Sequence, residues 1–374
     1  MSTRVVLLRG AAVSAWDLRP YELLGDPYEV RVLVPRRNLY PTGGLGVVQV
    51  TAPTLSDRLP AGRLGVLATR ALGERHFGLR KQLQGADIVH VAELGNWYSA
   101  HAAALRDALG FRLVVTAWET LPLLGAYRNV RTRRYARSVL DEADRFLPTT
   151  ERARDALLLE GAPSERIVVC EPGIDVDAFA AGREPRPGAD GSHLLLSVGR
   201  LVWEKGHQDL MRAVALLRRG GRRDLRVLIV GAGPEEGRLR ALASDLGLAD
   251  AVSFSGTVAY EEMPVLYARA SCLVLASLPV RYWEEQFGMV LAEAMAAHVA
   301  IVASTSGAIP EVVGPHGACF APGDWVGLAR ALELGPLARA PAERVAPETE
   351  RLERFSTGAA AARLRAVYDE LLSA

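Results

Sequence analysis

Several features are scarce or missing in this 374-residue sequence, and each absence excludes a class of protein. No apolar run reaches the roughly 18 residues that a membrane-spanning helix needs, and no signal peptide precedes the first apolar run. The three cysteines are far apart, which gives neither a disulfide framework nor a metal-binding spacing. The formal net charge is only +1, so no bulk charge favours nucleic acid. We expect a soluble cytoplasmic protein with no metal site and no nucleic-acid partner.

Short apolar, β-branched runs alternate with amphipathic stretches along the whole chain. Such strands, separated by helices, are typical of parallel sheets covered on both faces. Residues 181–192 are rich in proline, glycine and charge, which predicts a linker. We predict an α/β fold with two Rossmann-like, doubly wound domains, residues 1–180 and 193–350, facing a central cleft. Residues 351–374 should form a helical segment that packs back on the first domain. The expected strands are 5–8, 30–34, 88–91, 113–116, 146–148 and 167–169, then 194–198, 227–230, 252–254, 272–276 and 300–303.

Two glutamates, Glu285 and Glu293, are the most informative feature of the second half. Glu285 lies in a loop shortly before a glycine, and Glu293 lies about one turn into an apolar helix. A helix N-terminus attracts phosphate through its free N–H groups and its dipole, whereas carboxylates accept hydrogen bonds from hydroxyls. The arrangement suits a ligand with hydroxyl groups at its ends and negative charge in the middle, as in a nucleotide sugar. Glu284 could point inward in place of Glu285.

A second cluster follows the strand expected at 194–198. Gly199 permits a tight turn there, and Arg200 and Lys205 extend from the same loop toward one point. Two cations at that point can neutralise a diphosphate and the charge that develops when it leaves. Pairing of these cations with Glu204 and other surface acids is the alternative explanation.

The tripeptide Gly231-Ala232-Gly233 follows the next strand. A proline comes directly after it and a third glycine arrives only at Gly237, so it is a weak dinucleotide-binding fingerprint. A tight turn is the better prediction. An oxidoreductase that binds NAD stays open as a lesser alternative.

Taken in order, the motifs of the second half resemble those of family 4 of the retaining glycosyltransferases, also described as glycosyl transferases group 1, which have the GT-B fold. The resemblance covers about residues 193–330. It implies a nucleoside-diphosphate sugar such as a UDP-sugar or GDP-sugar as the donor, an acceptor hydroxyl, and neither metal nor cofactor. The motifs are Val198–Leu201, Glu204–Gly206, Val230–Pro234, Phe254–Gly256, Glu285 with Glu293–Ala296, and Gly307 with Pro310–Glu311.

The resemblance also implies roles for particular residues. Arg200 and Lys205 would grip the diphosphate, Glu293 would bind the ribose hydroxyls, and Glu285 would bind the transferred hexose. If the departing phosphate oxygen takes the acceptor proton, the protein contributes mainly positioning and cationic stabilisation, so Arg200, Lys205 and Glu285 are the expected catalytic residues. Further donor contacts are expected at Gly199, Val258, Phe287, Gly288, Met289 and Val290, and at Gly10 in the first half.

The first half resembles the family less closely. The family often has a histidine after the strand 113–116, where this chain has Trp118. Glu119 and His90, the latter expected at the end of an earlier strand, are polar substitutes on the acceptor side, although each also has a core or capping explanation. The acceptor itself, whether a saccharide, a lipid-linked compound or a small natural product, is left open, as is the oligomeric state.

Three alternatives to a transferase remain at this point: a nucleotide-sugar epimerase or hydrolase on the same fold, the NAD-binding oxidoreductase, and a non-catalytic sensor of nucleotide sugars. Positive charge also gathers in the run Arg128–Arg137. A solvated surface is the ordinary explanation of such a run. Because it lies in the acceptor half, it is also a candidate for peripheral contact with the inner face of a membrane.

Overall fold

The computed structural model describes residues 2–11, 13–40, 42–44, 46–60, 62–124, 129–180, 183–185 and 191–373. They form two compact units, which are treated separately: unit 1 is Met1–Gly173 with Thr357–Ala374, and unit 2 is Ile174–Ser356. Arg128 and much of the predicted linker, namely residues 181–182 and 186–190, lie outside the described residues.

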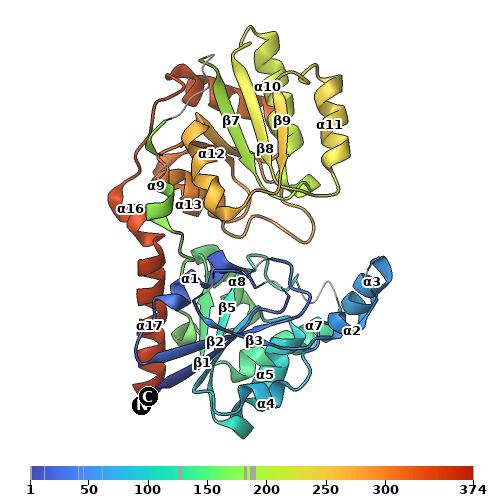
Figure 1. The fold of residues 1–374 in the computed structure, drawn as a ribbon, viewed down its shortest axis with the longest axis vertical. Coiled ribbons are helices and arrows are strands. Elements are labelled where there is room, and N and C mark those ends of the chain that lie inside the picture. Colours follow the sequence, from blue (N-terminus) through green and yellow to red (C-terminus); the bar gives the residue numbers. More distant parts are fainter. Residues whose placement is uncertain are drawn as a thin grey trace. The chain divides into compact units, whose positions relative to one another are not determined.

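Unit 1 is built on a six-stranded parallel sheet with the order β3-β2-β1-β4-β5-β6 (Figure 1). Side chains of successive strand residues point to opposite faces, and both faces are covered. Val5 and Leu7 of β1 join the core beside α1 and α17, whereas Val6 and Leu8 join the core beside α5. The strands are β1 (Thr3–Leu8), β2 (Tyr28–Val34), β3 (Val48–Thr51), β4 (Ile88–Ala92), β5 (Arg112–Ala117) and β6 (Arg145–Pro148).

The last helix of the chain, α17, belongs to unit 1 and packs against α1. It buries Leu364, Val367 and Tyr368 in the same core as β1. The α-helices of unit 1 are α1 (Ala15–Glu22), α2 (Leu55–Arg58), α3 (Arg63–Leu72), α4 (Leu79–Leu83), α5 (Trp97–Leu109), α7 (Val130–Glu142), α8 (Glu151–Glu160) and α17 (Thr357–Ser373), with a 3-10 turn at Ser164–Arg166.

Unit 2 repeats this topology with the order β12-β11-β10-β7-β8-β9. Its strands are β7 (His193–Val198), β8 (Leu225–Val230), β9 (Val252–Gly256), β10 (Cys272–Leu275), β11 (Ala300–Ser304) and β12 (Ala318–Phe320). Its α-helices are α9 (Val176–Ala180), α10 (His207–Arg219), α11 (Glu236–Asp245), α12 (Met263–Arg269), α13 (Met289–Ala296), α14 (Ile309–Val313), α15 (Trp325–Leu334) and α16 (Thr349–Arg354). Short 3-10 turns lie at Trp203–Lys205, Tyr260–Glu262, Gly314–His316 and Pro336–Ala338.

The prediction of two doubly wound parallel sheets is confirmed, and the differences concern edges and boundaries. The edge strands β3 and β12 were not expected, and the expected strand 167–169 makes only a single bridge, between Ile167 and Phe146. The boundary falls at Gly173 rather than residue 180, because Phe179 of α9 packs on Tyr260 and Tyr267 of unit 2. The predicted C-terminal segment 351–374 is divided, since α16 belongs to unit 2 and α17 to unit 1.

Candidate functional site

The strand order of unit 2 reverses between β7 and β10, and the loops that follow these two strands interlock. A Cβ atom at Gly206, whose φ is 70°, would lie 1.8 Å from the carbonyl oxygen of Ala276. The backbone N–H of Leu278 donates to the carbonyl of Glu204 at 2.8 Å. Open parallel sheets bind ligands at such a switch point, beyond the carboxyl ends of the strands. This edge is therefore where a ligand site of unit 2 is expected.

Lys205 and Glu285 form a buried ion pair at this edge. Lys205 Nζ lies 2.7 Å from Oε2 and 3.0 Å from Oε1 of Glu285, and Ser277 Oγ donates to Oε2 at 2.6 Å. The two charged side chains are only 15% and 8% exposed. The ring centroid of Trp283 lies 4.8 Å from Nζ, close enough for a cation–π contact. The structure thus brings together the residues predicted for the diphosphate and for the sugar.

Arg200, by contrast, extends into solvent from the loop after β7. Its side chain is 61% exposed and lies 3.9 Å from Glu204, so this alternative partner holds it only weakly. The loop itself is fixed from below by His207, whose Nε2 lies 3.2 Å from the carbonyl of Arg200 and whose Nδ1 lies 2.9 Å from Ser197 Oγ. Burial lowers the pKa of His207 to about 4, so the ring is neutral.

The backbone of Glu285 is clamped by the loop that follows β11. The N–H of Ala308 donates to the carbonyl of Glu285 at 2.9 Å. A Cβ atom at Gly307, with φ of 57°, would lie 2.1 Å from that same carbonyl oxygen. Glu284 is buried as well. Glu285, however, is the glutamate that faces Lys205, so the alternative that Glu284 takes its place at this cation is not realised.

Glu293 is the fifth residue of α13 and its side chain is buried. Tyr267 donates its hydroxyl to Oε2 at 2.8 Å. Burial raises the pKa of Glu293 to about 7, and the hydrogen bond from Tyr267 opposes this rise. The carboxylate is therefore costly to keep charged in the unliganded protein, and further hydroxyl donors would favour its ionised form.

The other predicted donor contacts lie near the start of α13 or at neighbouring strand ends. Gly288, with φ of 81°, is the residue before the first turn of α13, which contains Met289 and Val290. Phe287 is buried edge-to-face against Phe355, with ring centroids 5.5 Å apart. Gly199 follows β7. A Cβ atom at this position would lie 3.5 Å from the Lys205 side chain. Val258 is half-buried in the loop after β9.

Gly231 and Gly233 are required by backbone packing. A Cβ atom at Gly231 would lie 2.0 Å from the carbonyl oxygen of Gly199, and one at Gly233 would lie 2.4 Å from that of Leu201. A turn begins at the second of them, where the N–H of Glu236 donates to the carbonyl of Gly233 at 3.3 Å. Because both glycines are explained by contact with the loop after β7, they give no support to a dinucleotide fingerprint.

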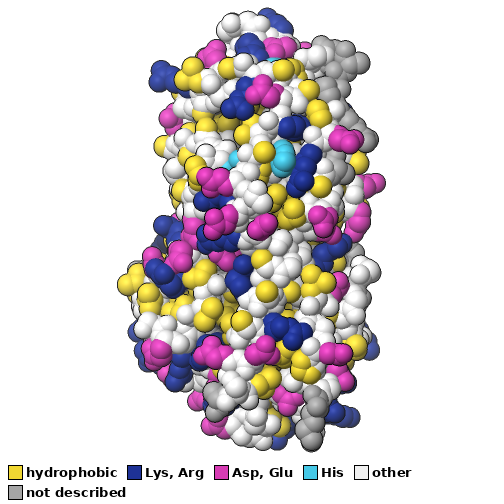
Figure 2. Space-filling view, turned by 90° about the vertical axis from the view of Figure 1, so that its left-hand side faces the viewer, with side chains coloured by type: hydrophobic (Ala, Val, Ile, Leu, Met, Phe, Trp, Pro, Cys, Tyr) yellow, Lys and Arg dark blue, Asp and Glu magenta, His cyan; other side chains and the backbone are white. Residues whose placement is uncertain are grey.

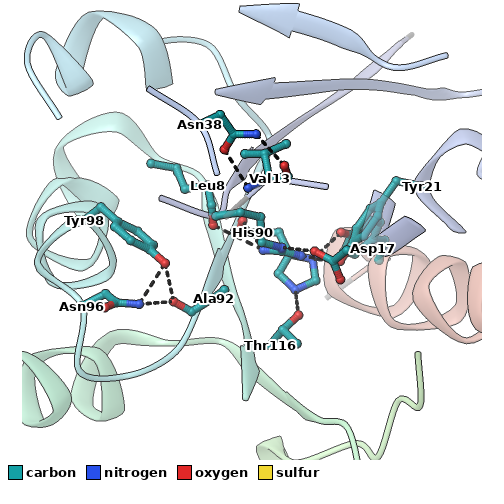
Figure 3. Close-up of polar contacts among 12 residues, drawn as sticks. Leu8, Val13, Asp17, Tyr21, Asn38, His90, Ala92, Asn96, Tyr98 and Thr116 are labelled. Atoms are coloured by element: carbon teal, nitrogen blue, oxygen red, sulfur yellow. Dashed lines mark hydrogen bonds and ion pairs between the residues drawn. The ribbon is translucent and has the colours of Figure 1, made fainter. Parts of the chain in front are cut away.

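His90 of unit 1 is a core residue, which corrects the expectation that it lies at a strand end. It occupies the middle of β4 and is fully buried. Its Nε2 lies 2.7 Å from Thr116 Oγ1 (Figure 3). Its Nδ1 lies 2.6 Å from the hydroxyl of Tyr368. Burial holds the pKa of His90 well below its usual range. Because the ring is fully buried and both of its nitrogens have partners, it cannot contact an acceptor substrate. His90 therefore organises the interior of unit 1.

Gly10 also has a structural explanation within unit 1. Its φ is 57°, and a Cβ atom there would lie 2.8 Å from Cε1 of Tyr98. The Tyr98 hydroxyl donates to the carbonyl of Ala92 at 3.1 Å, which fixes the ring in this place. The group that closely approaches Gly10 is therefore an aromatic side chain, where the sequence suggested a phosphate.

Glu93, directly after β4, is a residue of unit 1 to which the sequence gave no individual role. It lies at the switch point between β1 and β4 with φ of 65°, a strained conformation for a residue other than glycine. Its N–H donates to the carbonyl of Thr116 and its Oε1 accepts from the N–H of Trp118, both at 2.8 Å. Burial raises the pKa of Glu93 to about 7, and the bond from Trp118 opposes this.

The remaining acceptor-side candidates, Trp118 and Glu119, lie in the turn that Glu93 holds. Glu93 fixes the turn after β5, which carries Trp118 and Glu119. Glu119 accepts a hydrogen bond from the N–H of Leu121 at 3.1 Å, so it partly serves its own turn. Positive φ at a glutamate has no signature in the sequence. Glu93 could have been noticed only as an acid that directly follows an apolar strand.

Within the described part of the chain, no cluster of histidine, cysteine and acidic side chains could hold a metal ion. No described helix combines the length and apolarity that crossing a bilayer requires. Arg133, Arg134 and Arg137 are exposed on α7. Figure 2 shows basic and acidic side chains interspersed over the face in view, without a large patch of one sign.

Comparison with known proteins identifies the class. The model described as "Glycosyltransferase Family 4" matches residues 9–178, and the model described as "Glycosyl transferases group 1" matches residues 182–335. The MMP alpha-(1->4)-mannosyltransferase of Mycolicibacterium hassiacum is 30% identical over 304 residues, which cover 78% of this chain and 70% of that protein. The chain belongs to the family 4 glycosyltransferases with the GT-B fold.

More distant or partial matches agree with this class. The D-inositol 3-phosphate glycosyltransferase of Mycobacterium sp. (strain JLS) is 33% identical over 186 residues, 47% of this chain and only 40% of that relative. The structure of HepE from Anabaena in complex with UDP has a TM-score of 0.73 at 16% identity, covering 98% of this chain and all of that chain. Sucrose-phosphate synthase from Thermosynechococcus elongatus has a TM-score of 0.68 at 20% identity, covering 99% of each chain. At these identities the structures support the fold alone.

Proposed function

We propose that this protein is a retaining, metal-independent glycosyltransferase that moves a hexose-type sugar from a nucleoside-diphosphate sugar to an acceptor hydroxyl. The observation that carries the proposal is the buried Lys205–Glu285 pair at the switch point of unit 2, beside the exposed Arg200. One relative is named as GDP-mannose-dependent and one structural neighbour was solved with UDP-glucose. We keep both nucleotide classes as donor candidates.

The geometry divides the electrostatic work between the two cations. Glu285 already neutralises Lys205, so this pair adds little net charge to the site. Lys205 has three N–H donors, and it can therefore contact a phosphate oxygen while it stays bonded to Glu285. Arg200 supplies the less compensated positive charge, because its side chain is exposed and Glu204, its ion-pair partner among the described residues, is 3.9 Å away. We expect Arg200 to stabilise the leaving diphosphate and Lys205 with Glu285 to position the diphosphate and the sugar.

The two glutamates then serve hydroxyl groups. Glu285 accepts hydrogen bonds from the sugar with the oxygen capacity that Lys205 and Ser277 leave. Glu293 accepts from the ribose, as the family resemblance implies, and this contact favours its charged form. Neither carboxylate needs to act as a base, because the departing phosphate oxygen can take the proton of the acceptor hydroxyl.

The test begins with donor binding. UDP, GDP, ADP and their sugars are screened by thermal unfolding, since a ligand of the folded state stabilises it by about 2.7 kcal/mol at a hundredfold excess over its Kd. We expect one nucleotide class to raise the Tm, and NMR of the product to show the donor's anomeric configuration. A protein whose Tm responds to none of these nucleotides would overturn the proposal. A free epimerised or hydrolysed sugar nucleotide, formed equally with and without acceptors, would instead support the epimerase or hydrolase.

Arg200→Ala separates catalysis from stability. We expect turnover to fall by roughly 10²–10³-fold, the effect of removing one preorganised stabilising group, with little change in the free energy of unfolding because the side chain is exposed. Arg238→Ala on α11, which removes an 82% exposed arginine, is the matched control and should keep full turnover. Lys205→Ala is less clean, since it leaves Glu285 buried without its cation and should cost about 3 kcal/mol of stability.

Membrane contact is a separate part of the proposal. The exposed arginines of α7 suit an acidic lipid surface, which would keep the protein cytoplasmic and peripheral. Sedimentation with vesicles tests this: we expect binding to vesicles with anionic lipid, weakened in a variant with Arg133, Arg134 and Arg137 replaced by Ser. Equal binding of the variant and the parent protein would remove α7 as the contact.

A further inference from the structure

Unit 1 contains a small pocket beyond the carboxyl ends of β5 and β6, bounded by α1 and α17. Its volume is about 40 Å³, whereas a cavity needs about 10–15 Å³ to hold one water. The pocket therefore admits a group such as a hydroxymethyl, and a whole sugar ring would have to rest at its mouth. The polar and aromatic residues that line it are Trp16, Asp17, Tyr21, Thr116, Trp118, Thr149, Cys170 and Glu171.

Thr149 lines this pocket and has an unsatisfied hydroxyl. The residue is 1% exposed, and its Oγ1 has no hydrogen-bond partner among the described residues. Its backbone is held in place, because the N–H of Thr149 donates to the carbonyl of Ala117 at 3.1 Å. Leaving a hydroxyl buried and unpaired costs roughly 1–3 kcal/mol. A ligand hydroxyl in the pocket would recover this energy.

The charges around the pocket are already balanced. Asp17 lies 3.5 Å from Arg9, and Glu171 lies 3.3 Å from Arg363. Arg9 is buried, and its guanidinium also donates to Tyr21 and to the carbonyl of His90. The lining itself includes two carboxylates and neither lysine nor arginine. A phosphate placed there would meet acidic oxygens and no available cation.

The two indoles favour the carbon face of a ring. Trp16 and Trp118 are both half-buried and both line the pocket. A flat aromatic surface with a polar edge suits a hydroxylated ring whose C–H groups pack against it. The backbone N–H of Trp118 donates to Oε1 of Glu93, so the turn that carries this indole is held in a defined position.

We propose that this pocket is an acceptor subsite that takes one hydroxyl-bearing group of an uncharged, hydroxylated ring, with Thr149 as its hydrogen-bonding partner, and that it discriminates against acceptors phosphorylated next to that group. The inference rests on the proposed function and specifies its acceptor class. Thr149 is a binding residue in this assignment, and the discrimination against anions comes from a lining that has carboxylate oxygens but neither lysine nor arginine.

The test compares neutral compounds with their phosphates: myo-inositol with inositol 3-phosphate, and glucose with glucose 6-phosphate. The full-length protein is saturated with the nucleotide found in the donor screen, and binding is measured by saturation-transfer NMR at millimolar concentrations. We expect at least one neutral compound to bind, with at least tenfold higher affinity than its phosphate. Tighter binding of the phosphates, or no binding of either neutral compound, would overturn the inference.

Variants of the hydroxyl make the assignment specific. Thr149→Val removes the hydroxyl and keeps the shape, and we expect about tenfold weaker binding of the neutral compound. Thr149→Ser should restore most of the affinity, and Thr51→Val on the exposed edge strand β3 should change nothing. Thr149→Val with parental affinity would remove Thr149 from the subsite. The nucleotide-induced Tm shift should be the same in all three variants, so failure of donor binding counts against the proposed function and failure of acceptor preference counts against this subsite alone.

Discussion

Units 1 and 2 have the same strand order, yet they use buried polar groups in different ways. Unit 2 pairs Lys205 with Glu285 in the loops after its strands, and bonds Tyr267 of α12 to Glu293 of α13. Unit 1 places its main network inside the sheet, where His90 joins Tyr368 to Thr116. The same topology can therefore support a charged site at one sheet edge and a polar core in another sheet.

The glycines of the two units also differ in which group blocks a side chain at their position. In unit 2, a Cβ atom at Gly206 or Gly307 would collide with a carbonyl oxygen of the neighbouring loop. In unit 1, a Cβ atom at Gly10 would meet the ring of Tyr98. A carbonyl oxygen within a hydrogen-bonded loop cannot move aside, whereas a side chain has some freedom. Close interlocking of strand-end loops fixes the charged groups of unit 2, which is the preorganisation that a donor site needs.

Two of the buried histidines, His90 and His207, give the strongest test of this difference. Both rings are neutral, and each ring nitrogen lies within hydrogen-bonding distance of a partner. His207 differs from His90 because it supports the loop that carries Arg200. His90→Leu should cost roughly 3 kcal/mol, because it leaves Tyr368 and Thr116 without their partner. Chemical denaturation measures this loss. At equal folded fractions we expect the His90 variant to bind the donor nucleotide normally and His207→Leu to bind it several-fold more weakly.

Equal weakening of nucleotide binding by both histidine variants would contradict the division between a structural network in unit 1 and a site-supporting one in unit 2. Tyr368→Phe is a useful companion. It removes only the hydroxyl bonded to His90, so it should reproduce part of the stability loss with no effect on the nucleotide.

Gly307 and Gly10 form a matched pair, because each has φ of 57°. The strain of alanine at positive φ is therefore common to both variants. Gly307→Ala must also displace the carbonyl of Glu285, so we expect it to cost at least about 2 kcal/mol and to reduce turnover. Gly10→Ala needs only a shift of Tyr98 and should cost less while sparing turnover. A larger loss of stability in the Gly10 variant would show that the loops of unit 1 are the more tightly interlocked.

The sequence predicted the fold well because buried parallel strands are continuous apolar runs. It missed β3 and β12 because both are short edge strands with largely exposed residues, so burial left no apolar run there. It also predicted a strand at 167–169, where apolar character reflects packing beside β6 with a single bridge. The alternation of strands and helices predicted doubly wound parallel sheets, and with them the edge on which the loops gather. It did not predict the order of the strands, which the structure supplies.

The site was predictable to the extent that short motifs place groups on one sheet edge. Glu285, Lys205 and Arg200 all lie after strands of unit 2, as expected. The motifs could not predict which side chains bond to each other. The hydrogen bond between Lys205 and Glu285, for example, joins residues 80 positions apart. The same limit explains the error at His90. The sequence around a histidine in an apolar strand is the same whether its partners are solvent or, as here, Tyr368 and Thr116.

Glu93 and Glu293 offer the finest comparison, one acid from each unit with its pKa raised to about 7 by burial. A raised carboxyl pKa means that the folded state binds a proton more tightly than the unfolded state. Stability should therefore fall as pH rises from about 4.5 to 7, by at most ~1.4 kcal/mol per pH unit for each group, and level off above that. Denaturation of Glu93→Gln and Glu293→Gln between about pH 5 and pH 8 should each show a smaller slope than the parent protein.

Nucleotide should distinguish the two acids. Ribose hydroxyls that donate to Glu293 favour its charged form and lower its pKa, so saturating nucleotide should remove the part of the slope that Glu293→Gln removes. The part due to Glu93 should persist, because its hydrogen-bond partners are the backbone of β5 and the turn after it. If nucleotide flattened the slope of the Glu293→Gln protein as well, Glu93 would have to sense the donor, and the separation of a donor unit from an acceptor unit would fail at this residue.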